Sequence, residues 1–384
     1  MIADRAWVVR NIGFDPVKEP APSETFAFAP AAQSRNHEDW QREIIDFDSE
    51  AGEGMQFFAF SKATSLSRYQ DLDWPEGLAP QTAPTAGGEK DGPLPNADVL
   101  VVTWTVDEGH ALSRVLTPGK DSKTDYLSYT HNFDAISKLM RPGCPAISAK
   151  RLGAYWRTSI GGKSVVVFKS DSHMSQDGPK LPNRQVWRQI IHEVQPALVI
   201  TTGTAGGIGT KCEVGDVIVS PIVRFDCLSK FKAEPFATAI FENEAATETR
   251  FREAEKLMLV NASQLPPDNK RPPKIIATKP GHNADSVMTT DFFGFDTSDN
   301  HWHLQGLGSV CEMGDAVLGL VASEMQSQAP SWLAIRNVSD PQIKAEGTRH
   351  DQANVAGTIY KAFGRWSSIC SAIACWAVIA AMPT

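Results

Sequence analysis

Apolar and polar positions alternate from Asp98 onward in a pattern that predicts strands and helices in turn. Six short apolar runs rich in β-branched residues predict buried strands: Val99–Thr103, Ser164–Lys169, Leu198–Thr202, Asp216–Ser220, Lys274–Thr278 and Trp332–Val338. Apolar residues recur at helical spacing in four segments: Arg184–Val194, Thr247–Leu259, Gly314–Gln326 and Ala353–Ala381. This alternation predicts an α/β domain with a mixed or mainly parallel sheet, whose ligands sit beyond the carboxyl ends of strands.

Residues 1–96 lack this regular pattern and carry scattered aromatic side chains. Prolines and glycines gather at 75–95, a composition typical of a linker or a loose loop. We therefore divide the chain into an irregular N-terminal extension with a Pro/Gly-rich linker, residues 1–96, and an α/β domain, residues 97–384. The aromatic residues predict that the extension buries some surface, as a small subdomain or against a neighbouring subunit.

The amino-acid composition argues against several classes of protein. The 384 residues carry 37 basic and 45 acidic side chains, a net charge of −8 that argues against nucleic-acid binding. No CxxC pair or zinc-finger spacing occurs among the six cysteines, so we expect reduced thiols in a cytoplasmic protein without a metal site. The first residues show no run typical of a signal peptide. The apolar stretch Ile369–Met382 is short for a membrane span and predicts a packed helix.

The segment Leu198–Ser220 joins two apolar runs through a glycine-rich turn at Gly203–Gly207. Clustered glycines let a backbone approach a ligand closely. Thr204 and the N–H groups of Ala205 and Gly206 could line a sugar or an anion. A plain turn between two buried strands would show the same glycines, so other segments must decide between these alternatives.

Carboxylates follow two of the predicted strands. Glu108 comes shortly after the strand that ends at Thr103, where it could act as a general base toward water or stabilise a helix N-terminus. Asp340 follows Ser339 at the end of another strand. It could act as a general acid if its site raises its pKa, or it could cap the next segment.

A third feature lies where a strand is predicted to enter a helix, in Gly308–Leu320. Met313 could pack on the apolar face of a sugar, although methionine is more often part of a core. Glu312 beside it could bind a hydroxyl or cap the helix.

Together these segments resemble the nucleoside phosphorylase and nucleosidase superfamily, whose members cleave the N-glycosidic bond of nucleosides. The resemblance is closest to the methylthioadenosine/S-adenosylhomocysteine nucleosidases. Their glycine segment, N-T-G-S-A-G-G, is similar to Thr201–Gly207, and their V-G-D-[IV]-V-V-S is similar to Val214–Ser220. The resemblance covers roughly residues 97–380. It implies a three-layer α/β/α fold with a central mixed sheet and, as in the family, a homo-oligomer.

The resemblance also implies roles for single residues. Glu108 matches the carboxylate that activates the attacking water, and Asp340 matches the aspartate that protonates the purine N7. Met313 matches the methionine beneath the ribose, and Phe293 falls near the aromatic residue that stacks on the base. The remaining residues expected to bind substrate are Thr204, Ala205, Gly206, Arg224, Glu312, Asp315 and Ser339.

One position departs from the family pattern. The family reads E-M-E, and its last glutamate holds the ribose hydroxyls, whereas this chain has Gly314 after Met313. Asp315 could take over that role, the sugar could differ, or catalysis could be lost. Thr201 stands where hexameric phosphorylases carry a phosphate-binding arginine. We therefore expect cofactor-free hydrolysis of a purine nucleoside or nucleotide, with a phosphorylase or a nucleoside-binding sensor as alternatives.

Overall fold

The computed structural model describes residues 72–83, 91–243, 250–266 and 268–383, together with residues 2–3, 6, 29–30 and 45–46. The strands β2 (Ala29–Pro30) and β3 (Ile45–Asp46) pair with each other. The prediction that the N-terminal extension forms a subdomain or an oligomer arm falls largely outside the described residues.

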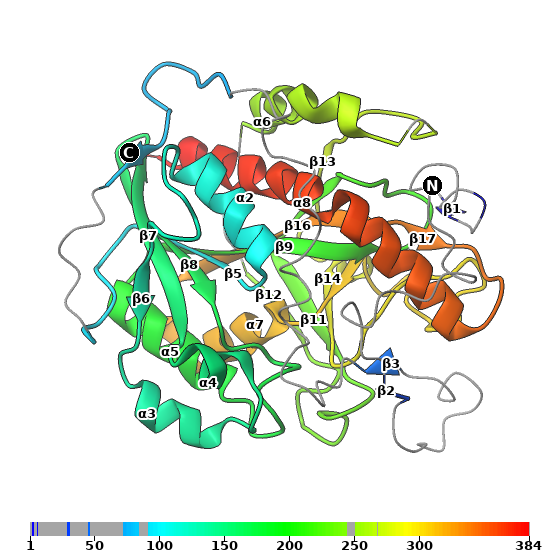
Figure 1. The fold of residues 1–384 in the computed structure, drawn as a ribbon, viewed down its shortest axis with the longest axis horizontal. Coiled ribbons are helices and arrows are strands. Elements are labelled where there is room, and N and C mark those ends of the chain that lie inside the picture. The colour runs from blue at the N-terminus through cyan, green and yellow to red at the C-terminus, as the bar shows by residue number, and fades with distance from the viewer. Residues whose placement is uncertain are drawn as a thin grey trace.

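A mixed sheet forms the centre of the fold (Figure 1). Its middle strands, in spatial order, are β7 (Gly153–Ile160), β8 (Lys163–Ser170), β5 (Val99–Thr103), β9 (Leu198–Gly207), β16 (Ser331–Asp340) and β10 (Val217–Ser220). The four strands from β8 to β16 run parallel, while β7 and β10 are antiparallel to their neighbours. The carboxyl ends of β5, β9 and β16 therefore meet at one edge of the sheet.

The sheet continues from the end of β9 through a second group of strands. These are, in order, β15 (Val310–Glu312), β14 (Val287–Thr290), β11 (Ile222–Asp226) and β12 (Ile240–Glu242). Shorter strands extend the margins: β4 (Gln81–Thr82) and β6 (Leu127–Tyr129) pair with β7, and β13 (Ile275–Ala277) pairs with β10.

Helices cover both faces of the sheet, as Figure 1 shows. On one face lie α2 (Val106–Leu116), α6 (Phe251–Met258) and α8 (Arg349–Ala381); on the other lie α5 (Asn183–Val194) and α7 (Asp315–Met325), with α3 (Phe133–Ile136) and α4 (Pro145–Ala149) nearby. Alternate residues of β5 enter different cores. Val101 belongs to the core beneath α8, whereas Leu100 belongs to the core beneath α5 and α7. The predicted three-layer fold is thereby confirmed.

The predicted turn at Gly203–Gly207 is wrong, because these residues continue β9 as a strand. β16 pairs with β9 from Leu198 to Gly206, and β15 pairs with it at Gly206 and Gly207. Neighbouring strands thus satisfy the backbone of the glycine segment, which leaves it no need to turn.

The long helix α8 is the one described helix that is apolar and long enough to cross a membrane. It is instead a core helix, since 83% of its most apolar window is buried in the fold. It begins at a capping box formed by Thr348 and Asp351 and packs on β16, β9, α2 and α6. The predicted packing of the C-terminal helix is confirmed.

Residues 72–83, expected to be part of a linker, pack on this core. The rings of Trp74 and Trp376 lie 4.6 Å apart, and the Trp376 indole N–H donates to the Leu78 carbonyl at 2.8 Å. At the other end of the chain's described part, β1 (Ile2–Ala3) pairs with β17 (Gln342–Ile343), directly after β16. Residues 72–83 thus pack on the core, while the linker and the domain boundary at 97 stay predictions.

Candidate active site

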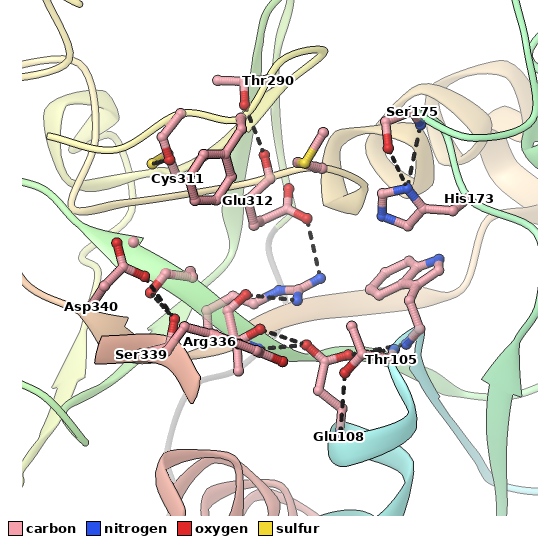
Figure 2. Close-up of a pocket in the computed structure, with 18 of the residues that line it drawn as sticks. Thr105, Glu108, His173, Ser175, Thr290, Cys311, Glu312, Arg336, Ser339 and Asp340 are labelled. Carbon is pink, nitrogen blue, oxygen red and sulfur yellow. Dashed lines mark hydrogen bonds and ion pairs between the residues drawn. The ribbon is translucent and has the colours of Figure 1, made fainter. Parts of the chain in front are cut away.

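A cavity opens where the carboxyl ends of β5, β9 and β16 meet β15 (Figure 2). Its empty space, including the open mouth, is about 890 Å³. All the predicted site residues line this cavity except Arg224 and Asp315. Four segments far apart in the sequence thus converge on one place.

Glu108 is anchored at the start of α2. Thr105 and Glu108 form a capping box, in which each side chain accepts a hydrogen bond from the other's backbone N–H. The carboxylate accepts five hydrogen bonds in all, at 2.7–3.2 Å, from the hydroxyl and N–H of Thr204, the Thr103 hydroxyl and the N–H groups of Trp104 and Thr105. Glu108 therefore stabilises the helix N-terminus, as one of the two alternatives expected, and lines the cavity as well.

These donors decide the charge of Glu108. Burial by itself would raise the pKa of its carboxyl, but the Arg336 guanidinium and the hydrogen bonds more than offset burial, so the pKa lies below its ordinary value. Glu108 is ionised at neutral pH.

Gly203 leaves room for the Glu108 carboxylate because it has no Cβ. A Cβ added to Gly203 would lie 2.3 Å from Glu108 Oε1, and the backbone there has φ of +147°. Only glycine allows the carboxylate to reach the N–H of Thr204 beside it. The glycine segment thus makes room for a side chain of the protein.

Asp340 stands at the opposite end of the cavity in a different environment. Its Oδ1 accepts a hydrogen bond from the Ser339 hydroxyl at 2.9 Å, and Ser339 also lies 3.2 Å from the Ala205 carbonyl. Burial raises the pKa of Asp340 to about 7. A Cβ on Gly206 would lie 3.1 Å from Asp340 Oδ2, so a second glycine of β9 gives room to the second carboxyl.

Arg336 lies between the two carboxyl groups. Its Nε donates to Asp315 at 2.8 Å, and its second terminal nitrogen donates to both Asp315 and Glu312. Its guanidinium also lies 4.9 Å from the centre of the Trp104 ring, a cation–π contact. The structure therefore directs Asp315 to Arg336 and away from the cavity lining, which contradicts its expected contact with the sugar.

Glu312 caps α7, which was one of its two expected roles beside binding a hydroxyl. Its carboxylate accepts from the N–H groups of Gly314 and Asp315 at 2.6 and 2.9 Å, and from the Thr289 hydroxyl. At Gly314, an added Cβ would lie 3.3 Å from the Trp104 ring. The indole thus occupies the space that a longer side chain at 314 would need.

The structure places Arg224 outside the cavity. It lies on β11 and donates to the Leu307 carbonyl at 3.3 Å, and it is absent from the residues that line the cavity. Arg224 does not line this cavity because β11 is separated from β9 by β14 and β15, so its position gives no support to the predicted substrate contact. Met313 and Phe293 do line the cavity, both half-buried.

Sequence reasoning missed several lining residues: Trp104, His173, Gln176, Arg336 and Tyr360. Arg336 carries a usable signal, since it interrupts an apolar strand that is buried from Trp332 onward. His173 and Gln176 belong to a loop without periodicity, and Tyr360 lies within the long helix α8. Within the described ranges, no three histidine, cysteine, aspartate or glutamate side chains are grouped to hold a metal ion.

The sequence profile of the phosphorylase superfamily matches residues 130–374, more than half of the chain. The chain belongs to the phosphorylase superfamily. This confirms the superfamily predicted from the motifs. No curated protein matches the chain at a significant level.

Solved structures of nucleosidases are similar to this superfamily member at low identity. A 5′-methylthioadenosine/S-adenosylhomocysteine nucleosidase from Neisseria meningitidis is 14% identical, with 74% of this chain and 99% of that chain covered and a TM-score of 0.44. An S-adenosylhomocysteine nucleosidase from Streptococcus pyogenes is 13% identical, with 76% of this chain and 100% of that chain covered and a TM-score of 0.47. Futalosine hydrolase of Helicobacter pylori is 13% identical, with 73% of this chain and 96% of that chain covered and a TM-score of 0.44. Likeness at this level carries no substrate over to this chain.

Proposed function

We propose that this superfamily member hydrolyses the N-glycosidic bond of a purine nucleoside. The observation that supports this most is the contrast between two buried carboxyl groups in one cavity. The pKa of Asp340 is raised to about 7, and that of Glu108 is lowered. Environments that push two carboxyl pKa values apart provide one acid and one base.

In the proposed reaction, Asp340 donates its proton to N7 of the purine as the C1′–N9 bond breaks. Glu108 holds the water whose oxygen bonds to C1′ and takes a proton from that water. A carboxylate of low pKa is a weak base, but it suffices here, because water becomes acidic as it bonds to an electron-poor C1′. The free base and the sugar then leave, Glu108 releases its proton to solvent, and Asp340 is reprotonated from solvent.

Met313 and Phe293 complete the proposed site. Both side chains line the cavity and are half-buried, which leaves apolar surface for a ligand. We assign Phe293 to the base and Met313 to the sugar, as the family resemblance implies.

Hydrolysis is favoured over phosphorolysis by the charges around the cavity. Among the described residues that line it, Arg336 is the one lysine or arginine, and its guanidinium is held by Asp315 and Glu312. A phosphate would have to compete with Asp315 for Arg336 and would be repelled by Glu108, at a cost in electrostatic energy.

The test is release of free base from a panel of purine nucleosides, each with and without phosphate. We expect release that does not depend on phosphate. Strict dependence on phosphate would make the protein a phosphorylase. A ligand-induced rise in melting temperature without any release would make it a binding protein.

A further inference from the structure

We propose that His173 and Gln176 form a polar subsite for a neutral hydroxyl group at C5′ of the sugar. The inference rests on the proposed function and names its substrate class, a purine nucleoside with a free 5′-hydroxyl. It excludes both 5′-phosphates and 5′-alkylthio nucleosides as preferred substrates.

The hydrogen bonds of His173 define which ring nitrogen carries the proton. The Ser175 N–H lies 3.3 Å from His173 Nδ1, and the Ser175 hydroxyl lies 2.8 Å from the same atom. A backbone N–H can only donate, so Nδ1 accepts and the neutral ring carries its hydrogen on Nε2. Figure 2 shows Nδ1 of the ring facing Ser175. Within the described part of the chain, Nε2 has no hydrogen-bond partner, and the residue lines the cavity.

Gln176 adds a second polar group at the same end. Its residue is only 5% exposed, yet its carboxamide has no hydrogen-bond partner among the described residues, and it lines the cavity. Because the residue lines the cavity, its carboxamide is available there to donate to and accept from a ligand hydroxyl.

The loop that carries both residues is held in place from several sides. Asn183 donates to the Ser172 carbonyl at 2.9 Å, and Arg141 Nε donates to the Gln176 carbonyl at 2.7 Å. The Lys230 amine donates to the Ser175 carbonyl at 3.0 Å. These anchors fix the direction of the His173 ring before any ligand arrives, as a specific binding site requires.

The position of the subsite identifies the part of the ligand it meets. In Figure 2, Asp340 lies at one end of the cavity and His173 at the other, with Arg336 and Glu108 between them. In the proposed reaction the base lies at Asp340 and the water is held by Glu108. The sugar substituent that extends farthest from the base is the one at C5′, and it therefore reaches His173.

The charges at this end favour a hydroxyl over an anion. Burial lowers the pKa of His173 to about 4, and Arg336, Lys169 and Lys230 also lower it while Glu108 opposes them. The ring is therefore neutral at pH 7. Lys169 is paired with Asp171, and the lining otherwise brings carboxyl groups toward the ligand. A hydroxyl can accept from Nε2–H and donate to the Gln176 oxygen, whereas a methylthio group can do neither well.

The experiment compares kcat/KM for four purine nucleosides that differ only at C5′: hydroxyl, deoxy, methylthio and phosphate. We expect the wild-type protein to prefer the hydroxyl over the deoxy compound by about 10- to 100-fold, since one or two hydrogen bonds are lost. In His173→Phe, and independently in Gln176→Leu, this preference should shrink toward unity, because kcat/KM falls more for the hydroxyl compound than for the deoxy compound. The control variant His282→Phe, at an exposed histidine, should leave the preference for the hydroxyl compound unchanged.

Two results would overturn the subsite. One is a wild-type preference for the methylthio or phosphate compound; the other is an equal loss for the hydroxyl and deoxy compounds in both variants. If no compound releases base, the proposed function fails, and the shift in melting temperature with each compound then reports the subsite separately. The subsite would still be supported if the hydroxyl compound raised the melting temperature of the wild-type protein but not that of either variant.

Discussion

Glu108 and Asp340 are both buried against the glycine segment of β9, but their surroundings differ. Five donors and the nearby Arg336 guanidinium surround Glu108. Within the described residues, Asp340 receives one hydrogen bond, from Ser339. Burial is common to both carboxyl groups, so it cannot explain why one pKa falls and the other rises. The Arg336 charge and the hydrogen-bond donors around Glu108 make the difference, and the resulting charge assigns each carboxyl group its proposed role.

We expect the largest effect from replacing Asp340, the acid of this pair. Asp340→Asn keeps the shape and the contact with Ser339 but cannot donate the proton. We expect kcat for base release to fall by about 10²- to 10⁴-fold, with an unchanged melting temperature. Exposed Asp285→Asn is the control. Unchanged turnover in Asp340→Asn would remove Asp340 from the mechanism.

Replacing the base should affect both activity and stability. Glu108→Gln removes the negative charge and directs an amide NH₂ toward groups that also donate. We expect a rate loss of about 10²-fold or more and a loss of about 1–3 kcal/mol in the free energy of unfolding, measured by urea denaturation. Equal stability of the Glu108 and Asp340 variants would contradict the contrast between the two sites.

The glycines test the same contrast through the backbone. Gly203→Ala would place a Cβ 2.3 Å from the Glu108 carboxylate, whereas Gly206→Ala would place one 3.1 Å from Asp340. The first must displace the catalytic group, and we expect a loss of about 10²-fold in kcat/KM. The second needs a shift of a few tenths of an ångström and should cost under about tenfold. The reverse order would show that Glu108 need not sit where the structure places it.

The smallest effect is a shift in pH dependence. Activity requires protonated Asp340, so kcat/KM should fall as pH rises through about 7, and it should persist on the acid side until Glu108 is protonated below its ordinary pKa. The Ser339 hydroxyl lowers the pKa of Asp340. In Ser339→Ala we expect the alkaline limb to move upward by about one pH unit. A downward shift would mean that Asp340 does not control this limb.

Local sequence patterns predicted the order of strands and helices because burial imposes a period of two on strands and about 3.6 on helices. They also placed Glu108 and Asp340 next to strand ends. They fail at Gly203–Gly207, where the glycines predict a turn but the chain continues as a strand. They also do not predict that Arg224 lies outside the cavity, which depends on the order of strands β14 and β15. His173 escaped notice because a single polar residue in an irregular loop has no local signature.

Local patterns in the sequence predict the α/β alternation and the two carboxyl groups at the strand ends, and the resemblance of the motifs implies the three-layer fold and the superfamily. The protonation of the two carboxyl groups depends on the tertiary structure. Thr204 lies 96 residues from Glu108 in the chain, and Arg336 comes from a third strand. The pKa of a buried carboxyl depends on the donors and charges within a few ångströms. Those neighbours come together only when β5, β9 and β16 lie side by side.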